Sequence, residues 1–293
     1  MIFYNVENLF DTIDDPKKND NEFLPSYKKG WNSQKMFEKI SHINQVLDYF
    51  DFPALVGFCE IENKKVLELL LQNSNNRKKY GIVHYESEDE RGIDVGLIYH
   101  TDVFKYFESG YLRFILPQKQ KASSRDILWA KFLVKKDTFF VLVNHWPSRI
   151  GGKEESNSKR LTAANKAFDF IDSVQRVSPM SRIIFMGDLN DGPKDDAPKL
   201  ISQRLSPQIS EKSGDYGGTH CYKKEWEVLD HIMVSNNLIS KSKPKLIGNG
   251  KIVSPDFLME NDKESMQPKR TYTGIKYLGG YSDHLPVQIS IKL

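Results

Sequence analysis

Residues 182–191 read RIIFMGDLND. The stretch begins with a short apolar run and continues through Gly187 into Asp188, Asn190 and Asp191. An apolar run of this length, bounded by turn-forming residues, predicts a buried β-strand. The polar residues are therefore expected at the end of that strand, where the sheet meets solvent.

Other short apolar runs share this pattern, and their number predicts the fold class. Strands are expected at 2–6, 54–58, 81–85, 93–99, 127–134, 138–143, 182–187, 228–234 and 287–292. Apolar stripes at helical spacing predict helices over 33–50, 66–71 and 161–174. Because these helices do not alternate strictly with the strands, the sequence predicts a layered sandwich of the α/β (α+β) class rather than a doubly wound sheet.

Composition and length favour a single globular domain. The 293 residues contain 39% hydrophobic and 12% aromatic residues, which excludes a disordered chain. Neither an internal repeat nor a flexible linker is found, so one domain over residues 1–293 is expected. No apolar run reaches the roughly 18 residues of a helical membrane span. A formal net charge of +3 is too small to indicate a nucleic-acid partner by itself.

The cellular compartment is left open by the sequence. Met1 leads directly into an apolar stretch without the pattern of a signal peptide, so a cytoplasmic location is the default expectation and a trimmed exported form remains an alternative. Cys59 and Cys221 are too few for a disulfide framework and are expected as small buried side chains. A monomer is expected.

Polar residues at the strand ends point to the chemistry. They are Asn5, Glu7, Asn8, Glu60, Asn144, His145, Asp188, Asn190, Asp191, Asp230, His231, Asp283 and His284. One such residue is usually a turn former or a helix cap. Six strand ends of this kind, all with carboxylates, carboxamides or imidazoles, instead indicate the oxygen ligands of a hard divalent cation together with histidines.

This residue set suits metal-assisted hydrolysis of phosphoesters. Mg²⁺ prefers oxygen ligands and neutralises charge on phosphoryl oxygens, and Mn²⁺ is expected to substitute for it. A carboxylate can deprotonate the attacking water, and a histidine can donate to a non-bridging oxygen. Zinc would be expected to recruit more histidines or cysteines than this chain offers.

Eight motifs together resemble the endonuclease/exonuclease/phosphatase superfamily. In chain order they are YNVENLFD, GFCEIEN, DVGLIY, SRDILWAKF, VNHWPSR, FMGDLND, VLDHIMVS and YSDHLPV, and they run from residue 4 to residue 287. The resemblance implies a four-layer sandwich of two packed mixed β-sheets flanked by helices. It also implies a metal-dependent hydrolase acting on phosphate ester bonds.

The resemblance assigns metal and phosphate ligands residue by residue. Glu60 matches the principal Mg²⁺-binding glutamate of the family. Glu7 and Asp283 match acidic positions near the metal. Asn5 and Arg125 match residues of the phosphate region, the arginine in deoxyribonuclease-like members.

It also assigns the catalytic residues. Asp188 matches the residue that deprotonates or orients the water, and Asn190 matches a contact to phosphate or metal. His284 corresponds to the histidine on the scissile phosphate, and Asp230 to its hydrogen-bonding partner. His145 matches a histidine of deoxyribonuclease-like members that abasic-site endonucleases lack.

The substrate is less well defined. Basic segments at 77–79, 119–125 and 149–160 favour a nuclease or phosphodiesterase that binds nucleic acid, whereas the acidic run at 86–90 weakens that interpretation. The alternative is a phosphatase or phospholipid phosphodiesterase acting on inositol phosphates or sphingomyelin-type substrates. In that case residues 218–224 and 269–272 would hold a small anionic group.

Overall fold

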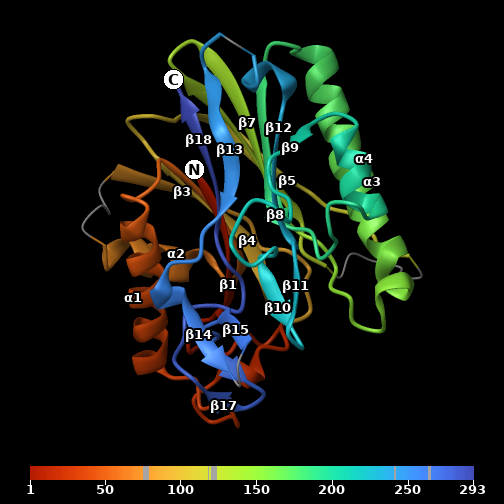
Figure 1. Cartoon of the computed structure of the whole chain (residues 1–293). Helices are drawn as coiled ribbons and strands as arrows, with labels where there is room; N and C mark the ends of the chain where they lie inside the picture. The colour runs from red at the N-terminus through yellow and green to blue at the C-terminus, as the bar shows by residue number, and fades with distance from the viewer. Residues whose placement is uncertain (75–78, 118, 120–123, 241, 263–264) are drawn as a thin grey trace.

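Two six-stranded sheets form the centre of the molecule (Figure 1). The computed structural model describes residues 1–74, 79–117, 119, 124–240, 242–262 and 265–293. Residues 77–78 and 120–123 of the predicted basic segments lie outside the described residues. The first sheet has the order β13-β18-β1-β2-β4-β3. Its strands are β1 Ile2–Leu9, β2 Leu55–Ile61, β3 Tyr80–His84, β4 Asp94–His100, β13 Lys245–Ile252 and β18 Val287–Lys292.

The second sheet has the order β5-β6-β7-β8-β12-β9. Its strands are β5 Lys105–Leu112, β6 Ile127–Val134, β7 Asp137–His145, β8 Arg182–Asp188, β9 Ser206–Pro207 and β12 Asp230–Val234. β1 pairs with β2, and β7 with β8, in parallel, while the other pairs within the two sheets are antiparallel. Both sheets are therefore mixed, as predicted.

Helices and short hairpins surround the two sheets. The α-helices are α1 Ser33–Tyr49, α2 Lys64–Gln72, α3 Lys153–Val177 and α4 Asp196–Ser202. The short 3-10 helices are η1 Asn21–Phe23, η3 Asn236–Leu238 and η4 Asp256–Leu258. The hairpins pair β10 His220–Tyr222 with β11 Glu225–Glu227, β14 Met259–Asp262 with β15 Ser265–Pro268, and β16 Tyr272–Thr273 with β17 Lys276–Tyr277. Within the described residues, no helix is both long and apolar enough to cross a bilayer.

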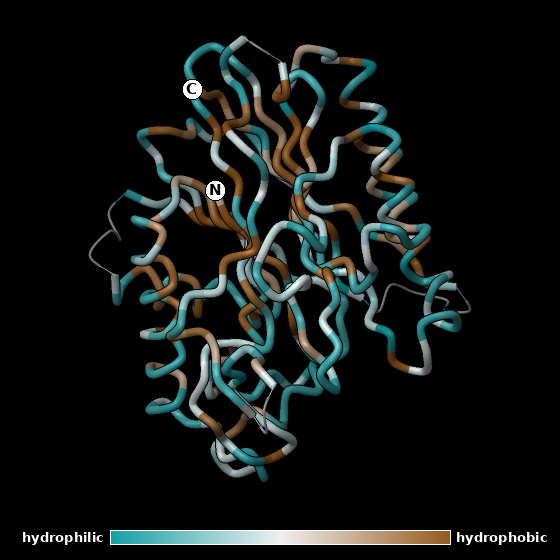
Figure 2. Tube along the Cα trace, in the orientation of Figure 1, coloured by the Kyte–Doolittle hydropathy of each residue, from teal (hydrophilic) through white to brown (hydrophobic). Residues whose placement is uncertain are grey.

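The alternation of side chains along the strands creates the layers. On β8, Ile184 and Met186 belong to the core shared by the two sheets, whereas Ile183 and Phe185 belong to the core under α3 and α4. α1 and α2 lie on the opposite side of the molecule, outside the first sheet (Figure 1). Apolar segments accordingly concentrate along the central strands (Figure 2). The predicted sandwich of two packed mixed sheets with flanking helices is confirmed.

Local sequence explains where the helices begin. Asn32 caps α1 by accepting a hydrogen bond from Lys35 N, and Asn63 caps α2 in the same way for Val66 N. α3 is longer than the predicted 161–174 because it begins at Lys153, directly after Gly152. Gly152 has a φ of 119°, a backbone conformation outside the helix that a residue with a Cβ rarely adopts. Glutamates in the first turn of α3 also complement the positive end of the helix dipole.

Candidate active site

The register of three neighbouring strands brings three predicted site residues together. In the register of the second sheet, Asp188 at the end of β8 pairs with His145 of β7 on one side and with Asp230 of β12 on the other. Asp188 also lies on the same face of β8 as Ile184 and Met186, which face the first sheet. All three polar side chains therefore project from one level of the second sheet toward the first.

Asn5 connects this group to the first sheet. Its Nδ2 donates to Asp188 Oδ2 at 3.0 Å and makes a longer contact of 3.4 Å with Glu60 Oε1. Its Oδ1 accepts a hydrogen bond from the backbone N–H of Glu7 at 2.9 Å, which holds the carboxamide in one orientation. One carboxamide thus bridges two carboxylates that come from opposite sheets.

A bulge in β2 directs Glu60 toward the site. A Cβ at Gly57 would lie 2.5 Å from Met186 Sδ of β8, so residue 57 of β2 faces the second sheet. Because side chains alternate along a strand, residue 59 faces the same way, and residue 60 of a regular strand would point away from the second sheet. The pairing with β4 shifts between Cys59 and Ile61, and Glu60 has a φ of 61°. As a result Glu60 Oε1 lies 4.0 Å from His145 Nε2.

His145 and His284 differ in their charge. Burial, together with the positive charges of Arg125 and Arg91, lowers the pKa of His145 well below its usual value, so this imidazole is neutral. Burial acts in the same direction on His284, but the charges of Asp230 and Asp188 outweigh it and raise the pKa of His284 well above its usual value. The site therefore holds one neutral and one protonated imidazole.

Asp188 lies between these two histidines. Its Oδ2 is 3.7 Å from His145 Nε2 and 3.9 Å from His284 Nε2. Burial raises the pKa of Asp188 to about 7, and the neighbouring charge of Asp230 adds to the effect while His284 opposes it. Its Oδ1 accepts a hydrogen bond from the backbone N–H of Asn190 at 2.9 Å. A carboxylate with this pKa can exchange a proton near neutrality.

The loop after β8 also positions Asn190. This residue has a φ of 53°, and its Nδ2 donates to the Trp146 carbonyl at 3.1 Å. Arg125 donates to the same carbonyl at 2.9 Å and to Asp89 Oδ2 at 3.0 Å. The phosphate roles expected for both residues stay predictions.

Asp283 and Glu7 lie beside Arg270, a residue of the 269–272 segment that the phosphatase alternative expected to hold a small anionic group. Arg270 Nη2 donates to Asp283 Oδ2 at 2.8 Å, and Arg270 Nε is 3.7 Å from Glu7 Oε1. Glu7 accepts hydrogen bonds from the backbone N–H groups of Thr271 at 2.6 Å and Tyr272 at 3.3 Å. The structure thus shows Glu7 anchoring this loop, and its role near a metal stays a prediction.

Two further residues lie near the site: Lys39 was missed from the sequence, and His220 belongs to the 218–224 segment named for the phosphatase alternative. Lys39 is buried, and its ammonium contacts Thr271 Oγ1 and the Tyr281 carbonyl. Burial lowers the pKa of Lys39 to about 8, against the opposing effect of Glu7. The His220 ring lies 4.7 Å from that of His284, centroid to centroid. Position 39 follows Met36 by three residues, so the helical spacing of α1 could have placed it on the buried face.

Two groups of donor atoms in the site could hold a metal ion. The ligand atoms of Asp188, Asp230 and His284 lie within 4.8 Å of one another, and so do those of Cys59, His145 and Asp188. The Glu60 carboxylate adds an oxygen whose one hydrogen-bonding contact within the described residues is the 3.4 Å contact to Asn5. Carboxylates this close repel one another, and a bound cation would relieve that repulsion.

A sequence-family model described as the Endonuclease/Exonuclease/phosphatase family matches residues 1–293. The comparison with curated proteins found no match. Among solved structures, the chain is similar to a mannosyl-6-phosphatase of Bacteroides thetaiotaomicron VPI-5482, with 17% identity, a TM-score of 0.63, and coverage of 100% of this chain and 98% of that one.

Two other solved structures have the same fold. A humanized TDP2 of D. rerio shares 14% identity at a TM-score of 0.62, with coverage of 100% of this chain and 98% of that one. The human Nocturnin catalytic domain with bound sulfate shares 16% identity at a TM-score of 0.56, with coverage of 87% of each chain. At these identities the likeness establishes the fold.

Proposed function

The chain belongs to the endonuclease/exonuclease/phosphatase family of phosphoester-hydrolysing enzymes, and we propose that it is a Mg²⁺-dependent nuclease or phosphodiesterase. The observation that carries the mechanism is the position of Asp188 between a neutral and a protonated imidazole. This arrangement places a base next to a donor that stabilises negative charge.

In the proposed reaction, Asp188 orients a water and accepts its proton as the oxygen attacks phosphorus. Its pKa of about 7 makes it a stronger base than an ordinary aspartate. The His284 imidazolium donates from Nε2 to a non-bridging oxygen, a bond that strengthens as charge develops. Neutral His145 contributes a second hydrogen bond to the same phosphate.

Glu60 and Asp283 would hold the divalent cation. When bound, Mg²⁺ supplies charge neutralisation of the phosphoryl oxygens. Asn5 keeps the Asp188 and Glu60 carboxylates in place by donating to Asp188 and contacting Glu60. Arg270 offsets the charge of Asp283 from the other side.

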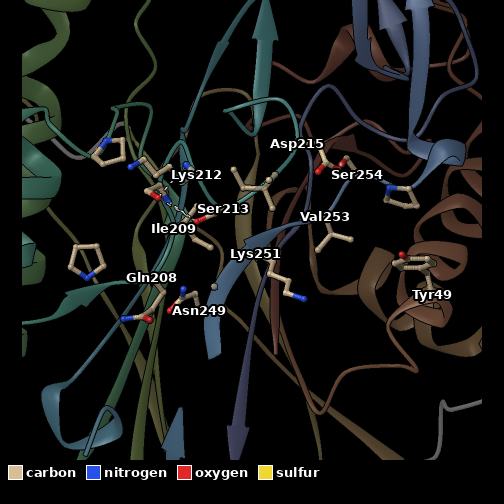
Figure 3. A pocket seen from close by; sticks show the side chains of 17 residues that line it. Tyr49, Gln208, Ile209, Lys212, Ser213, Asp215, Asn249, Lys251, Val253 and Ser254 are labelled. Atoms are coloured by element: carbon tan, nitrogen blue, oxygen red, sulfur yellow. Dashed lines mark hydrogen bonds between the residues drawn. The ribbon is translucent and has the colours of Figure 1, made fainter. Parts of the chain in front are cut away.

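A groove lined in part by the loop after β8 would take the outer part of an extended substrate in this proposal, although none of the candidate catalytic residues lines it. It has a volume of about 1000 Å³, and its lining includes Pro193, which follows Asp191 by two residues. Lys212 and Lys251 also line it (Figure 3). Neither ammonium forms an ion pair with any residue that the structure describes, so both are available to a phosphate backbone.

A phosphatase is the second candidate, and a specific observation favours it. Arginines close to the site are already paired: Arg149 with Glu227 at 2.7 Å, Arg125 with Asp89 at 3.0 Å, and Arg270 with Asp283 at 2.8 Å. Such pairing leaves little free positive charge for a long polyanion. The similarity to a mannosyl-6-phosphatase points the same way.

A substrate panel distinguishes the two candidates. The purified chain with Mg²⁺ is given supercoiled plasmid, bis-p-nitrophenyl phosphate, p-nitrophenyl phosphate, a hexose 6-phosphate and inositol phosphates. Faster cleavage of the diesters supports the proposal, whereas release of inorganic phosphate from monoesters alone would favour the phosphatase. Asp188→Asn, assayed in parallel, shows that the activity belongs to this chain.

A further inference from the structure

A second group of ligand-type side chains lies on the opposite face of the first sheet from the active site. His84 ends β3 and stands opposite Gly96 of β4. A Cβ at Gly96 would meet Leu67 of α2 at 2.7 Å, so this face of β4 looks toward the helix. Asp94 lies two residues before Gly96 and shares that face. His84 and Asp94 therefore point away from the inter-sheet side that carries Asp188.

The side chains of His84, Asp94 and Glu86 converge. His84 Nε2 is 3.6 Å from Asp94 Oδ2, and His84 Nδ1 is 3.8 Å from Glu86 Oε1. One ligand atom from each of the three lies within 4.8 Å of the others.

Two buried polar atoms in this cluster lack partners. The side chains of His84 and Asp94 are each 2% exposed. His84 Nε2 and Asp94 Oδ2 accept or donate no hydrogen bond within the part of the chain that the structure describes. Asp94 Oδ1, by contrast, accepts from the backbone N–H of Ser87 at 3.0 Å. Leaving a buried polar atom without a partner is destabilising, and one ligand between these two atoms would satisfy both.

We propose that His84, Glu86 and Asp94 bind one divalent first-row transition-metal ion of the Zn²⁺, Mn²⁺ or Co²⁺ type. Ligand atoms about 2.0–2.2 Å from a tetrahedral ion are roughly 3.4 Å apart, close to the observed 3.6 Å between His84 and Asp94. One imidazole nitrogen with two carboxylate oxygens favours such ions over Mg²⁺ or Ca²⁺, which prefer oxygen alone.

The electrostatics agree with this assignment. Burial lowers the pKa of His84 to about 4, with a further contribution from Lys64, so its ring is neutral and has a free lone pair. Burial raises the pKa of Asp94 to about 8, so a metal would displace a proton there. The nearby Lys18 ammonium donates to the backbone carbonyls of Ser87 and Asp89 rather than to the cluster.

A cavity reaches the cluster at Glu86, the one member of the three that lines it. A cavity of about 270 Å³ is lined by Glu86, Glu62 and Asp11, among other residues. The Glu86 side chain is 59% exposed and can rotate toward the ion, while water from the cavity completes the coordination. The loop after β3 also carries Asp89, which pairs with Arg125 at 3.0 Å. The proposed ion would thus hold the loop that positions Arg125.

Metal binding is measured on the full chain after removal of metals by chelation. Glu60→Gln serves as the background because it removes the principal ligand expected for the active-site cation. We expect one equivalent of Co²⁺ to bind, with the visible absorption of a site of low coordination number, and Zn²⁺ to displace it. Zn²⁺ should also raise the Tm of this protein.

Added to that background, Glu86→Gln and Asp94→Asn should each weaken Co²⁺ binding by more than about tenfold and abolish the Zn²⁺ effect on Tm. Glu86 is exposed, so its variant tests the site even if Asp94→Asn does not fold. His100→Ala, at the far end of β4, is the matched control and should bind as the background does. Absence of a 1:1 Co²⁺ complex, or binding unaffected by Glu86→Gln, would overturn the proposal and leave a proton shared by His84 and Asp94.

Discussion

His284 Nδ1 donates a 2.7 Å hydrogen bond to Asp230 Oδ2, and both side chains are buried. The bond fixes the ring so that Nε2 points toward Asp188. Burial by itself would lower the pKa of His284, but the carboxylates of Asp230 and Asp188 raise it well above the usual value. These carboxylates favour the protonated form of a buried histidine, which is the form that the proposed mechanism needs as a donor to a phosphate oxygen.

On the alkaline side, the rate of wild-type hydrolysis should therefore fall as His284 loses its proton, at a pH well above the usual pKa of histidine. Asp230→Asn removes one charge that raises this pKa, so the alkaline limb of kcat should move to lower pH by about one to two units. The acidic limb, set by Asp188 with its pKa of about 7 before a cation binds, should move much less. A pH–rate profile of both proteins measures the two limbs.

The coupling between Asp230 and His284 can also be tested by a double-mutant cycle. Asp230→Asn combined with His284→Ala should be scarcely slower than His284→Ala alone, because the aspartate acts through the histidine. Strict additivity in log kcat would contradict this and leave the orienting group of His284 unidentified. His145→Ala serves as a comparison that adds its own loss if it acts independently.

Glu60→Gln should lower kcat by orders of magnitude while the protein stays folded, because an amide lacks the charge that holds a divalent cation. Activity of the wild-type chain should require Mg²⁺ or Mn²⁺ and should be lost in excess chelator. The control is Glu68→Gln on α2, whose carboxylate pairs with Lys64 at the surface. Full activity of the chelated wild-type protein would refute the metal assignment.

Asp188→Asn retains the size and hydrogen-bonding reach of the side chain but removes the base. We expect kcat to fall by about 10²–10⁴-fold while KM changes little. Steady-state kinetics on the best substrate of the panel provide both constants. A change in KM alone would make Asp188 a binding residue and move the base elsewhere.

Lys212→Ala together with Lys251→Ala should raise KM for a polynucleotide. If each lysine contacts one phosphate, the slope of log binding against log salt should decrease by about 1.4 to 1.8. Lys105→Ala, on the exposed edge strand β5, is the control. An unchanged slope would remove the groove of Figure 3 from the substrate path.

The loop after β8 depends on a buried ion pair. Arg160 Nε lies 2.7 Å from Asp191 Oδ2, and both side chains are 0% exposed. His231 Nε2 contacts the Asp191 carbonyl at 2.8 Å, so this residue is held from two sides. Arg160→Met should lower the free energy of unfolding by about 3–5 kcal/mol, since it leaves a buried carboxylate with only the longer 4.0 Å contact to Arg149 among the described residues.

Chemical denaturation measures this loss. Arg176→Met, an exposed position on the same helix, should cost less than about 1 kcal/mol because its pair with Asp172 lies at the surface. Equal losses at the two positions would show that the buried pair does not hold the loop.

Local sequence was sufficient to predict the strands that carry the site. Apolar residues follow one another at regular spacing in β8, in β7 and along one face of α1. Because these residues are buried, their spacing predicts whether the segment is a strand or a helix. β5 and β13 were missed because they lie at sheet edges and are largely exposed, so their side chains lack that periodicity. Asp188 and His145 could be recognised because each follows such a run directly.

Apart from the Asp230–His284 pair, which the family resemblance had already implied, the tertiary structure decided which of these residues meet. Asn5 and Asp188 are 183 residues apart in the chain, and only sheet-on-sheet packing brings them within 3.0 Å. The bulge at Glu60 and the placement of Arg270 beside Asp283 likewise depend on register and on contacts with distant segments. The spacing of apolar residues predicts which face of a helix or strand is buried, but the packing of the whole chain determines which residues contact that face.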